Sequence, residues 1–357
     1  MQDARHIRNV PWTGPSRYLQ YGSVFLLSLV VLCYEIISTR ISSVIFVNDH
    51  ACIILSLSML GLGCGSVYSY STVRTADANR VASIISRAAV LTAGTLILFV
   101  VAVTGLSLTS PLPFFLLTFL PFFMAGIVYS QIYRLYALQS FTIYAADVVG
   151  GAAGALLSLG LLTIVGAPNS IQILAVFMLI VSLNFMGKSI GRNKTIAGYA
   201  ILLVILVLLM VNGKNEYTGH VPIGNYDGKD YYHVYPDAAS RAAIIDSRWS
   251  MYGRSDLVQY TDQDVVRQLF IDGAAGTQMY KFNGNLKKCN PPLLDLLLQH
   301  SNAIPFLVMN ENQKRTMLVI GPGGGKEILL GLFGGASQIT GVEINSDFVN
   351  IVKAAVK

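Results

Sequence analysis

Charged residues are scarce in this chain. Only 12% of its 357 residues are Asp, Glu, Lys or Arg, while 53% are apolar and the mean hydropathy is +0.56. A soluble domain carries about 25% charged residues. The composition therefore excludes an ordinary soluble protein and indicates an integral membrane protein that has the lipid bilayer as its main partner.

Residues that bind metals or form disulfides are also few. The chain has four cysteines and five histidines, and no CxxC motif or Cys/His spacing typical of a zinc site joins them. We therefore expect neither a disulfide framework nor a bound metal.

The positive charge belongs to one part of the sequence. Residues 1–212 contain 11 Lys and Arg against 5 Asp and Glu, whereas residues 213–357 contain 14 of each. Basic residues between apolar helices set membrane topology, and nucleic-acid binding needs a basic face on the soluble part. We therefore expect no nucleic-acid partner.

Long apolar runs predict a helical membrane bundle over residues 20–212. A span needs about 20 apolar residues, and seven segments qualify: 20–41, 50–70, 83–106, 112–136, 143–166, 169–187 and 196–212. The basic residues that precede the first run place residues 1–19 in the cytoplasm. Seven spans would put the C-terminal part on the other side of the membrane from the N-terminus, but two of the runs are short, so its side stays open.

Glycines and three charged residues stand out within the spans. Gly61 and Gly65, and likewise Gly150 and Gly154, have the four-residue spacing that lets helix backbones approach closely. Charged groups in lipid usually face the bundle interior and pair. We expect Glu35, Arg40 and Asp147 to be structural, with Arg40 paired to Asp147 or to Glu35.

Residues 213–290 predict a small β-rich region. The runs that begin at Ala242 and Gln268 are rich in β-branched and apolar residues, and Asp272-Gly273 is a turn signal. Pro291-Pro292 then begins a Leu-rich helix.

Residues 291–357 contain the pattern of a β-α-β unit. Met317 to Ile320 predicts a buried strand, Lys326 to Phe333 a helix, and Gln338 to Ile344 a second strand. The loop between the first strand and the helix holds Gly321, Gly323, Gly324 and Gly325, and Glu343 lies near the end of the second strand. Glycines let a backbone approach a ligand closely, and such an acid accepts hydrogen bonds from ribose hydroxyls.

This pattern predicts an adenosine-containing cofactor. It does not separate a dinucleotide from S-adenosylmethionine, since both contain an adenosine ribose. The spacing Gly-Pro-Gly-Gly-Gly differs from GxGxxG and favours S-adenosylmethionine. A Rossmann-like unit that binds no cofactor is the alternative.

These residues resemble a known family. The glycine loop and Glu343 look like motif I of class I S-adenosylmethionine-dependent transferases, and Leu269-Phe-Ile-Asp-Gly273 is similar to the N-terminal region of spermidine synthases. The segments Cys33–Arg40, Leu60–Gly65 and Tyr144–Gly151 resemble motifs of bacterial multi-span proteins that carry a spermidine-synthase-like domain. The resemblance implies a bacterial inner-membrane location and a partial Rossmann-like domain.

The resemblance also implies a reaction class. It points to aminopropyl transfer from decarboxylated S-adenosylmethionine to a small-molecule amine, or to methyl transfer from S-adenosylmethionine. Gly324 stands where spermidine synthases have an Asp that binds the amine end of the cofactor. The family's catalytic base follows a fourth strand, whereas this chain stops one helix after the second, so we expect it to be incomplete for catalysis and name no catalytic residue.

Two other functions fit the sequence. The chain can be a non-catalytic subunit of a membrane complex with a degenerate synthase-like domain, which the missing loop Asp favours. A transporter fits less well, because the spans contain few charges and no visible inverted repeat.

Overall fold

The computed structural model describes residues 17–47, 50–73, 77–186, 199–200, 203–207, 220–234, 242–261, 265–286 and 291–355. The chain separates into two compact units, residues 1–224 and 225–357. The predicted boundary between residues 212 and 213 lies outside the described residues.

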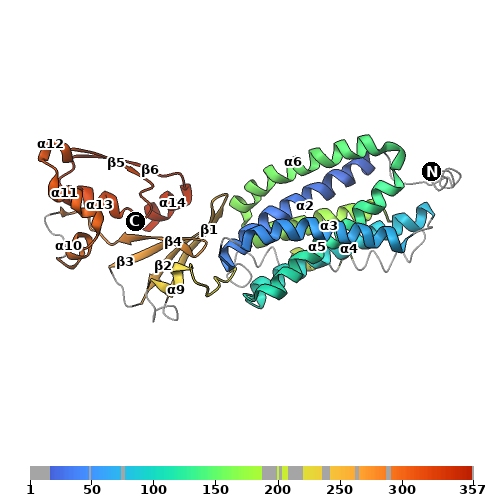
Figure 1. Cartoon of the computed structure of the whole chain (residues 1–357), viewed down its shortest axis with the longest axis horizontal. Helices are drawn as coiled ribbons and strands as arrows, with labels where there is room; N and C mark the ends of the chain where they lie inside the picture. The colour runs from blue at the N-terminus through green and yellow to red at the C-terminus, as the bar shows by residue number, and fades with distance from the viewer. Residues whose placement is uncertain are drawn as a thin grey trace. The chain divides into compact units, whose positions relative to one another are not determined.

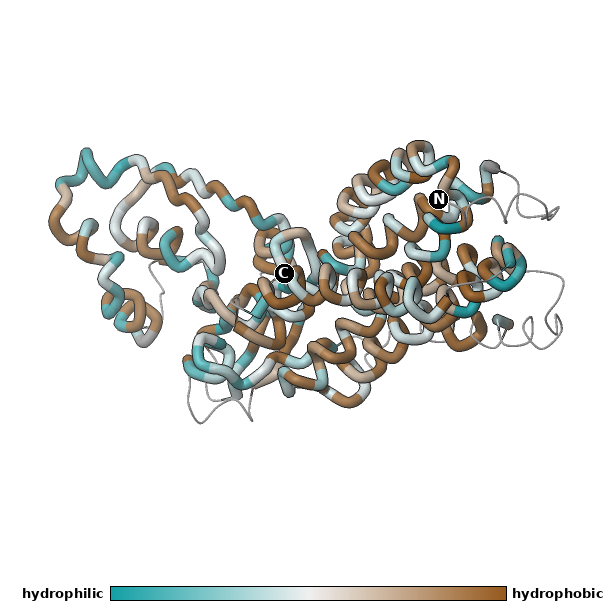
Figure 2. Tube along the Cα trace, turned by 45° about the vertical axis from the view of Figure 1, so that its right-hand side comes forward, coloured by the Kyte–Doolittle hydropathy of each residue, from teal (hydrophilic) through white to brown (hydrophobic). Residues whose placement is uncertain are grey.

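The first unit is a bundle of long helices (Figure 1). Six helical stretches among the described residues are long and apolar enough to cross a membrane, and apolar residues follow one another along their length (Figure 2). They confirm long apolar helices at six of the predicted segments, and the seventh, 196–212, falls mostly outside the described residues. The helices are α2 (Arg17–Ile45), α3 (Ala51–Thr72), α4 (Ala78–Val100) continued by the π-helix η3 (Val101–Gly105), α5 (Pro111–Leu135), the short 3₁₀ helix η4 (Ala137–Gln139) with α6 (Ser140–Val165), and α7 (Ala167–Asn184).

Local sequence explains where these helices begin and end. The Asp77 side chain caps α4 by accepting a hydrogen bond from the Arg80 amide at 3.1 Å. Gly166 separates α6 from α7 with φ +78°, a conformation that favours glycine. Pro168 follows in the first turn of α7, where the missing amide hydrogen costs no hydrogen bond.

Glycines bring helix backbones together, as the spacing predicts. A Cβ on Gly65 would lie 1.9 Å from the carbonyl oxygen of Phe123 in α5, and one on Gly61 would lie 2.6 Å from the Cβ of Phe122. Gly150 and Gly154 of α6 contact the α2 backbone in the same way, at Phe25 and Leu29. The small-residue pairs therefore join α3 to α5 and α6 to α2, and their predicted packing role is confirmed.

The second unit begins with a short helix and an antiparallel sheet. Helix α9 (Asp230–His233) precedes strands β1 (Ala242–Ser250), β2 (Gly253–Tyr260), β3 (Val266–Ile271) and β4 (Ala274–Tyr280), which pair in sequence order. Asp272 and Gly273 have φ +54° and +70°. These values at both central residues form the hairpin turn that Asp-Gly predicts.

A parallel β-α-β unit follows. Helix α10 (Pro291–Leu298), the 3₁₀ helix η7 (Ser301–Ala303), α11 (Ile304–Val308) and α12 (Glu311–Lys314) lead to β5 (Thr316–Ile320), α13 (Lys326–Phe333), β6 (Gln338–Val342) and α14 (Ser346–Ala355). Strands β5 and β6 pair in parallel, with Thr316 opposite Gln338 and Ile320 opposite Val342. The described residues of the second unit, 225–357, therefore contain one four-stranded antiparallel sheet and one two-stranded parallel sheet.

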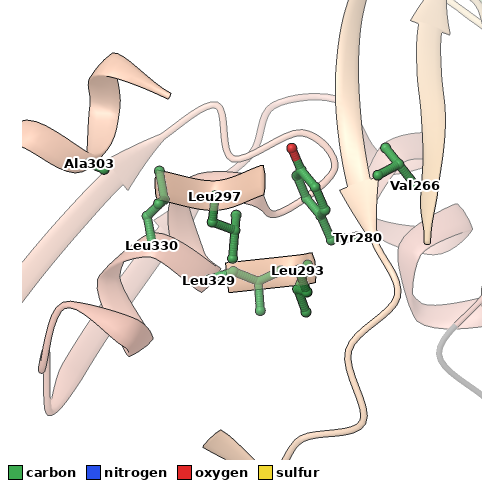
Figure 3. Packing of buried hydrophobic residues seen from close by; sticks show 7 residues of the cluster. All are labelled: Val266, Tyr280, Leu293, Leu297, Ala303, Leu329 and Leu330. Atoms are coloured by element: carbon green, nitrogen blue, oxygen red, sulfur yellow. The ribbon is translucent and has the colours of Figure 1, made fainter. Parts of the chain in front are cut away.

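Apolar side chains hold the β-α-β unit against the antiparallel sheet. Leu293 and Leu297 of α10 pack with Leu329 and Leu330 of α13 and with Tyr280 of β4 (Figure 3). On α14, Phe348 and Ile351 pack against apolar residues of β2, β3 and β4. Burial of this kind stabilises by about 25 cal/mol per Å² of apolar surface, and it fixes the loop after β5 beside β4.

Candidate cofactor site

The predicted glycine loop joins β5 to α13. Three of its glycines have positive φ: Gly321 at +68°, Gly323 at +50° and Gly325 at +87°. The Gly321 amide donates to the Val342 carbonyl of β6 at 2.8 Å, and the Gly325 amide donates to the Pro322 carbonyl at 2.7 Å. A side chain would strain the backbone at all three positions, so the sequence needs glycine here for the turn itself.

The loop has one side that packs on protein and one that is open. A Cβ on Gly324 would lie 2.3 Å from the Gln278 carbonyl oxygen of β4, and one on Gly323 would lie 2.7 Å from the Thr277 side chain. By contrast, a Cβ on Gly321 or Gly325 would meet no atom within 4 Å. Gly323 and Gly324 therefore pack on β4, whereas there is open space beside Gly321 and beside Gly325.

Glu343 follows β6 directly and bonds to the loop, a contact that the sequence did not predict. One oxygen of its carboxylate, Oε2, accepts a hydrogen bond from the Gly323 amide at 3.0 Å, and Oε1 accepts one from the Asn345 amide at 2.9 Å. Glu343 is half-buried and forms no ion pair with a described residue. A carboxylate offers about four acceptor positions, so two remain for other donors.

Two hydrogen bonds join side chains of β4 to one another and to the segment before η7. The Tyr280 hydroxyl lies 2.8 Å from Gln278 Oε1 and 2.7 Å from His300 Nε2. Burial lowers the pKa of His300 below its ordinary value; Lys326 lowers it further, and Glu327 opposes this shift. The sequence did not single out these residues, although Gln278 and Tyr280, two apart on a strand, share one face.

A cavity of about 390 Å³ lies elsewhere in this unit. It is mainly apolar and is lined by residues of η7, α11, α12, β5 and α13, including Phe306, Met309 and Leu330. Polar side chains at its wall include Glu327, whose Oε1 accepts from Asn302 Nδ2 at 3.1 Å. None of the four loop glycines nor Glu343 lines this cavity.

A separate group of charges is buried in the antiparallel sheet. Lys229, Arg254 and Asp256 are each at most 1% exposed. Arg254 pairs with Asp256 at 2.8 Å, and Lys229 Nζ donates to the Asp272 carbonyl at 2.7 Å. The Asp272 carboxylate accepts from the Arg254 amide at 2.7 Å, which ties the β3–β4 turn to β2. This network has a structural role in the hairpin.

The intramembrane charges do not pair as the sequence led us to expect. The Asp147 carboxylate of α6 accepts hydrogen bonds from Ser28 of α2 and from Tyr129 and Tyr133 of α5, the last two at 3.0 and 3.1 Å. Neither Arg40 nor Glu35 forms an ion pair with a described residue.

The predicted pairing of Arg40 with Asp147 is therefore wrong. Ser28, which contacts Asp147, precedes Arg40 by 12 positions in α2. That separation is roughly 18 Å along a helix at about 1.5 Å per residue, beyond the reach of an arginine side chain. Hydroxyl groups take the place of the expected cation.

Among the described residues, no group of three or more His, Cys, Asp or Glu could hold a metal ion. Comparisons with models of protein families, with curated proteins and with solved structures found no match to this chain. The geometry of the second unit is therefore the main evidence on function.

Proposed function

We propose that this chain is a membrane-anchored spermidine-synthase-like transferase, and that its second unit binds S-adenosylmethionine or decarboxylated S-adenosylmethionine. The six apolar helices serve as the anchor. The proposal includes a Rossmann-like character for the second unit and a small-molecule amine as the acceptor.

The observation that carries the proposal is the link between the glycine loop and Glu343. Parallel strands β5 and β6 bring the loop and the acid to the same edge of the sheet, where the Gly323 amide donates to Glu343. Ligands of open α/β sheets bind at the carboxyl ends of the strands. The arrangement supports a site for an adenosyl group at this edge.

The residues fit such a group. Gly321 and Gly325 leave space beside the backbone, so the methionine portion and ribose would lie against them. The two free acceptor positions of Glu343 would receive the ribose hydroxyls. The bound cofactor would supply a sulfonium that activates a carbon atom for transfer to a nucleophile.

Decarboxylated and intact S-adenosylmethionine are not distinguished by this loop. Gly324 stands where spermidine synthases carry an Asp, and its backbone packs on β4 so closely that a Cβ would lie 2.3 Å from the Gln278 carbonyl oxygen. An aspartate has no room at this position without movement of β4. The amine end of a decarboxylated cofactor would need another partner.

The contacts of the glycine loop and Glu343 also favour a second function, in which this unit binds no cofactor. Both Glu343 oxygens already bond to backbone amides, and two of the four glycines pack on protein. These contacts would stabilise the loop in a unit that binds no cofactor. The chain would then be a non-catalytic subunit of a membrane complex.

Calorimetric titration distinguishes the two functions. The detergent-solubilised chain is titrated with S-adenosylmethionine, its decarboxylated form and NAD. The proposal predicts binding of a methionine derivative, weakened about 10- to 100-fold in Glu343→Ala, because hydrogen bonds to a charged group contribute about 1.5–3 kcal/mol. The control Glu311→Ala removes an acid that is 85% exposed and should leave binding unchanged.

Three results would contradict this proposal. Absence of binding of both methionine derivatives favours the non-catalytic subunit. Tighter binding of NAD than of either derivative would show that the cofactor is a dinucleotide. Equal affinity of the wild type and Glu343→Ala for the methionine derivative would show that it binds elsewhere than at Glu343 and the loop.

A further inference from the structure

A buried hydrogen bond ties the segment after β6 to the antiparallel sheet. Asn345 lies between Glu343 and α14, and it is only 2% exposed. Its side-chain nitrogen, Nδ2, donates to Ser255 Oγ of β2 at 3.0 Å, and Ser255 is 1% exposed. The two residues are 90 positions apart in the chain, so this contact joins the β-α-β unit to the sheet.

The orientation of the Asn345 side chain follows from its partners. Its oxygen, Oδ1, accepts from the Asp347 backbone amide at 3.0 Å, and a backbone amide can only donate. The nitrogen therefore points to Ser255, whose hydroxyl oxygen accepts. Asp347 is the second residue of α14, so Asn345 also caps the first turn of that helix.

Asn345 also holds the carboxylate of Glu343. The backbone amide of Asn345 donates to Glu343 Oε1 at 2.9 Å, while the Gly323 amide donates to Oε2 at 3.0 Å. Each carboxylate oxygen is therefore held by one donor, and the two donors come from different segments of the chain. The acceptor positions that remain on the two oxygens consequently have a defined direction.

Both parts of the candidate cofactor site are attached to the same antiparallel sheet. The glycine loop packs on β4, where the Gly324 amide donates to Thr277 Oγ1 at 3.4 Å. Glu343 is attached through Asn345 to Ser255 of β2, and α14 itself packs on the sheet through its apolar residues. The sheet therefore fixes where the acid lies relative to the loop.

We propose that Asn345 is a positioning residue, which together with Ser255 orients the Glu343 carboxylate toward the ribose hydroxyls of an adenosyl ligand. Neither residue contacts the ribose. Ser255 holds the side chain of Asn345, and the Asn345 amide in turn holds one oxygen of Glu343. Binding groups need such support, because hydrogen bonds weaken steeply when their geometry changes. This inference rests on the proposed function, because it explains how the same site recognises the ribose.

Two variants remove the contact with the sheet and leave the cap of α14 in place. Ser255→Ala removes the acceptor and keeps Asn345. In Asn345→Ser, the new hydroxyl accepts from the Asp347 amide about as well as asparagine does, but it is too short to reach Ser255. Ser247→Ala is the control, because it removes a hydrogen bond to Asp256 at 2.7 Å within the same sheet.

The measurement is a preference between two ligands, which a general loss of stability does not change. Calorimetry of the detergent-solubilised chain compares 5′-methylthioadenosine with 5′-methylthio-2′,3′-dideoxyadenosine, which lacks both ribose hydroxyls. The wild type should prefer the first by about 10- to 100-fold, because the hydroxyls bond to a charged group.

The variants should change this preference to different extents. We expect Ser255→Ala and Asn345→Ser to lower it about 2- to 10-fold, the contribution of one neutral hydrogen bond. Glu343→Ala should abolish the preference, and Ser247→Ala should keep it. Adding Ser255→Ala to Glu343→Ala should have no further effect on the preference, because the serine acts only through the glutamate.

The results separate this inference from the proposed function. If the wild type shows the preference and both Ser255→Ala and Asn345→Ser keep it, the positioning role is wrong and the cofactor site stands. If the wild type binds the two compounds equally, or binds neither, the positioning role is wrong, and binding of S-adenosylmethionine decides whether the proposed function stands. If Ser255→Ala fails to fold, Asn345→Ser decides, because it breaks the same hydrogen bond from the other side.

Discussion

The loop glycines and Glu343 could be singled out from the sequence, whereas Tyr280 and His300 could not. Loop glycines and a strand-end glutamate stand out because turn geometry and strand polarity dictate them locally. The contact between Tyr280 and His300 spans 20 residues and depends on how α10 returns to the sheet. No local sequence pattern predicts how α10 packs against the sheet. From the sequence alone we could say only that the histidines do not form a metal-ligand set.

Lys229 illustrates a residue whose pKa is set mainly by burial in the folded protein. Burial lowers its pKa to about 8, while the neighbouring Asp272 carboxylate raises it and Arg254 lowers it. In the unfolded chain the same amine titrates near 10.4. The folded pKa is the lower one, so the unfolded state binds more protons between these values and stability should rise with pH in that window.

We predict that this rise disappears in Lys229→Met. The free energy of unfolding in urea is measured between pH 7 and 10 by the fluorescence of Trp249, with Trp12 replaced by Phe. The wild type should gain about 2 kcal/mol relative to the variant between pH 8 and pH 10, at up to about 1.4 kcal/mol per pH unit for one proton. Parallel pH curves for the two proteins would show that Lys229 is not desolvated. Tyr231 and Tyr232, whose raised pKa values act above pH 10, affect both proteins equally.

At the scale of elements, helix packing could be predicted in part. The four-residue glycine spacing predicted the contacts of α3 with α5 and of α6 with α2. The pairing of Arg40 could not be derived, because the offset of one helix along another is set by the whole interface. The structure places Asp147 against hydroxyl groups of α2 and α5 instead.

The α3–α5 contact provides a test with a control on the same helix. Gly65→Val should destabilise the bundle by about 1–3 kcal/mol, because its Cβ would meet the Phe123 carbonyl at 1.9 Å and overpacking costs energy of this size. Gly63→Val has the same helix propensity, and its Cβ would meet nothing within 4 Å.

Thermal unfolding of both variants in detergent measures the difference. We expect Gly65→Val to unfold several degrees below Gly63→Val, which should remain within about 0.5 kcal/mol of the wild type, as is usual for exposed substitutions. Equal transition temperatures for the two variants would mean that α3 and α5 do not approach at this glycine.

At the scale of the whole molecule, composition separates an apolar bundle from a charge-balanced second unit. The sequence predicted six of the described apolar helices. In the second unit it predicted strands at β1, β3, β5 and β6, helices at α10 and α13, and the Asp272-Gly273 turn, whereas it did not single out β2 and β4. The β4 packing of Gly323 and Gly324 was not visible, because a glycine required for a ligand and one required for a neighbouring strand look the same in sequence. The proposed function therefore depends on the open space beside Gly321 and Gly325.

Hydrogen–deuterium exchange with and without S-adenosylmethionine and its decarboxylated form tests this central claim most directly. If the adenosyl group lies between the loop and Glu343, saturating cofactor should slow amide exchange in peptides that cover residues 321–325 and 343–345, and the same protection in Glu343→Ala should need about 10- to 100-fold more cofactor. Unchanged exchange in both peptides, or protection confined to the cavity segment 302–318, would contradict the account.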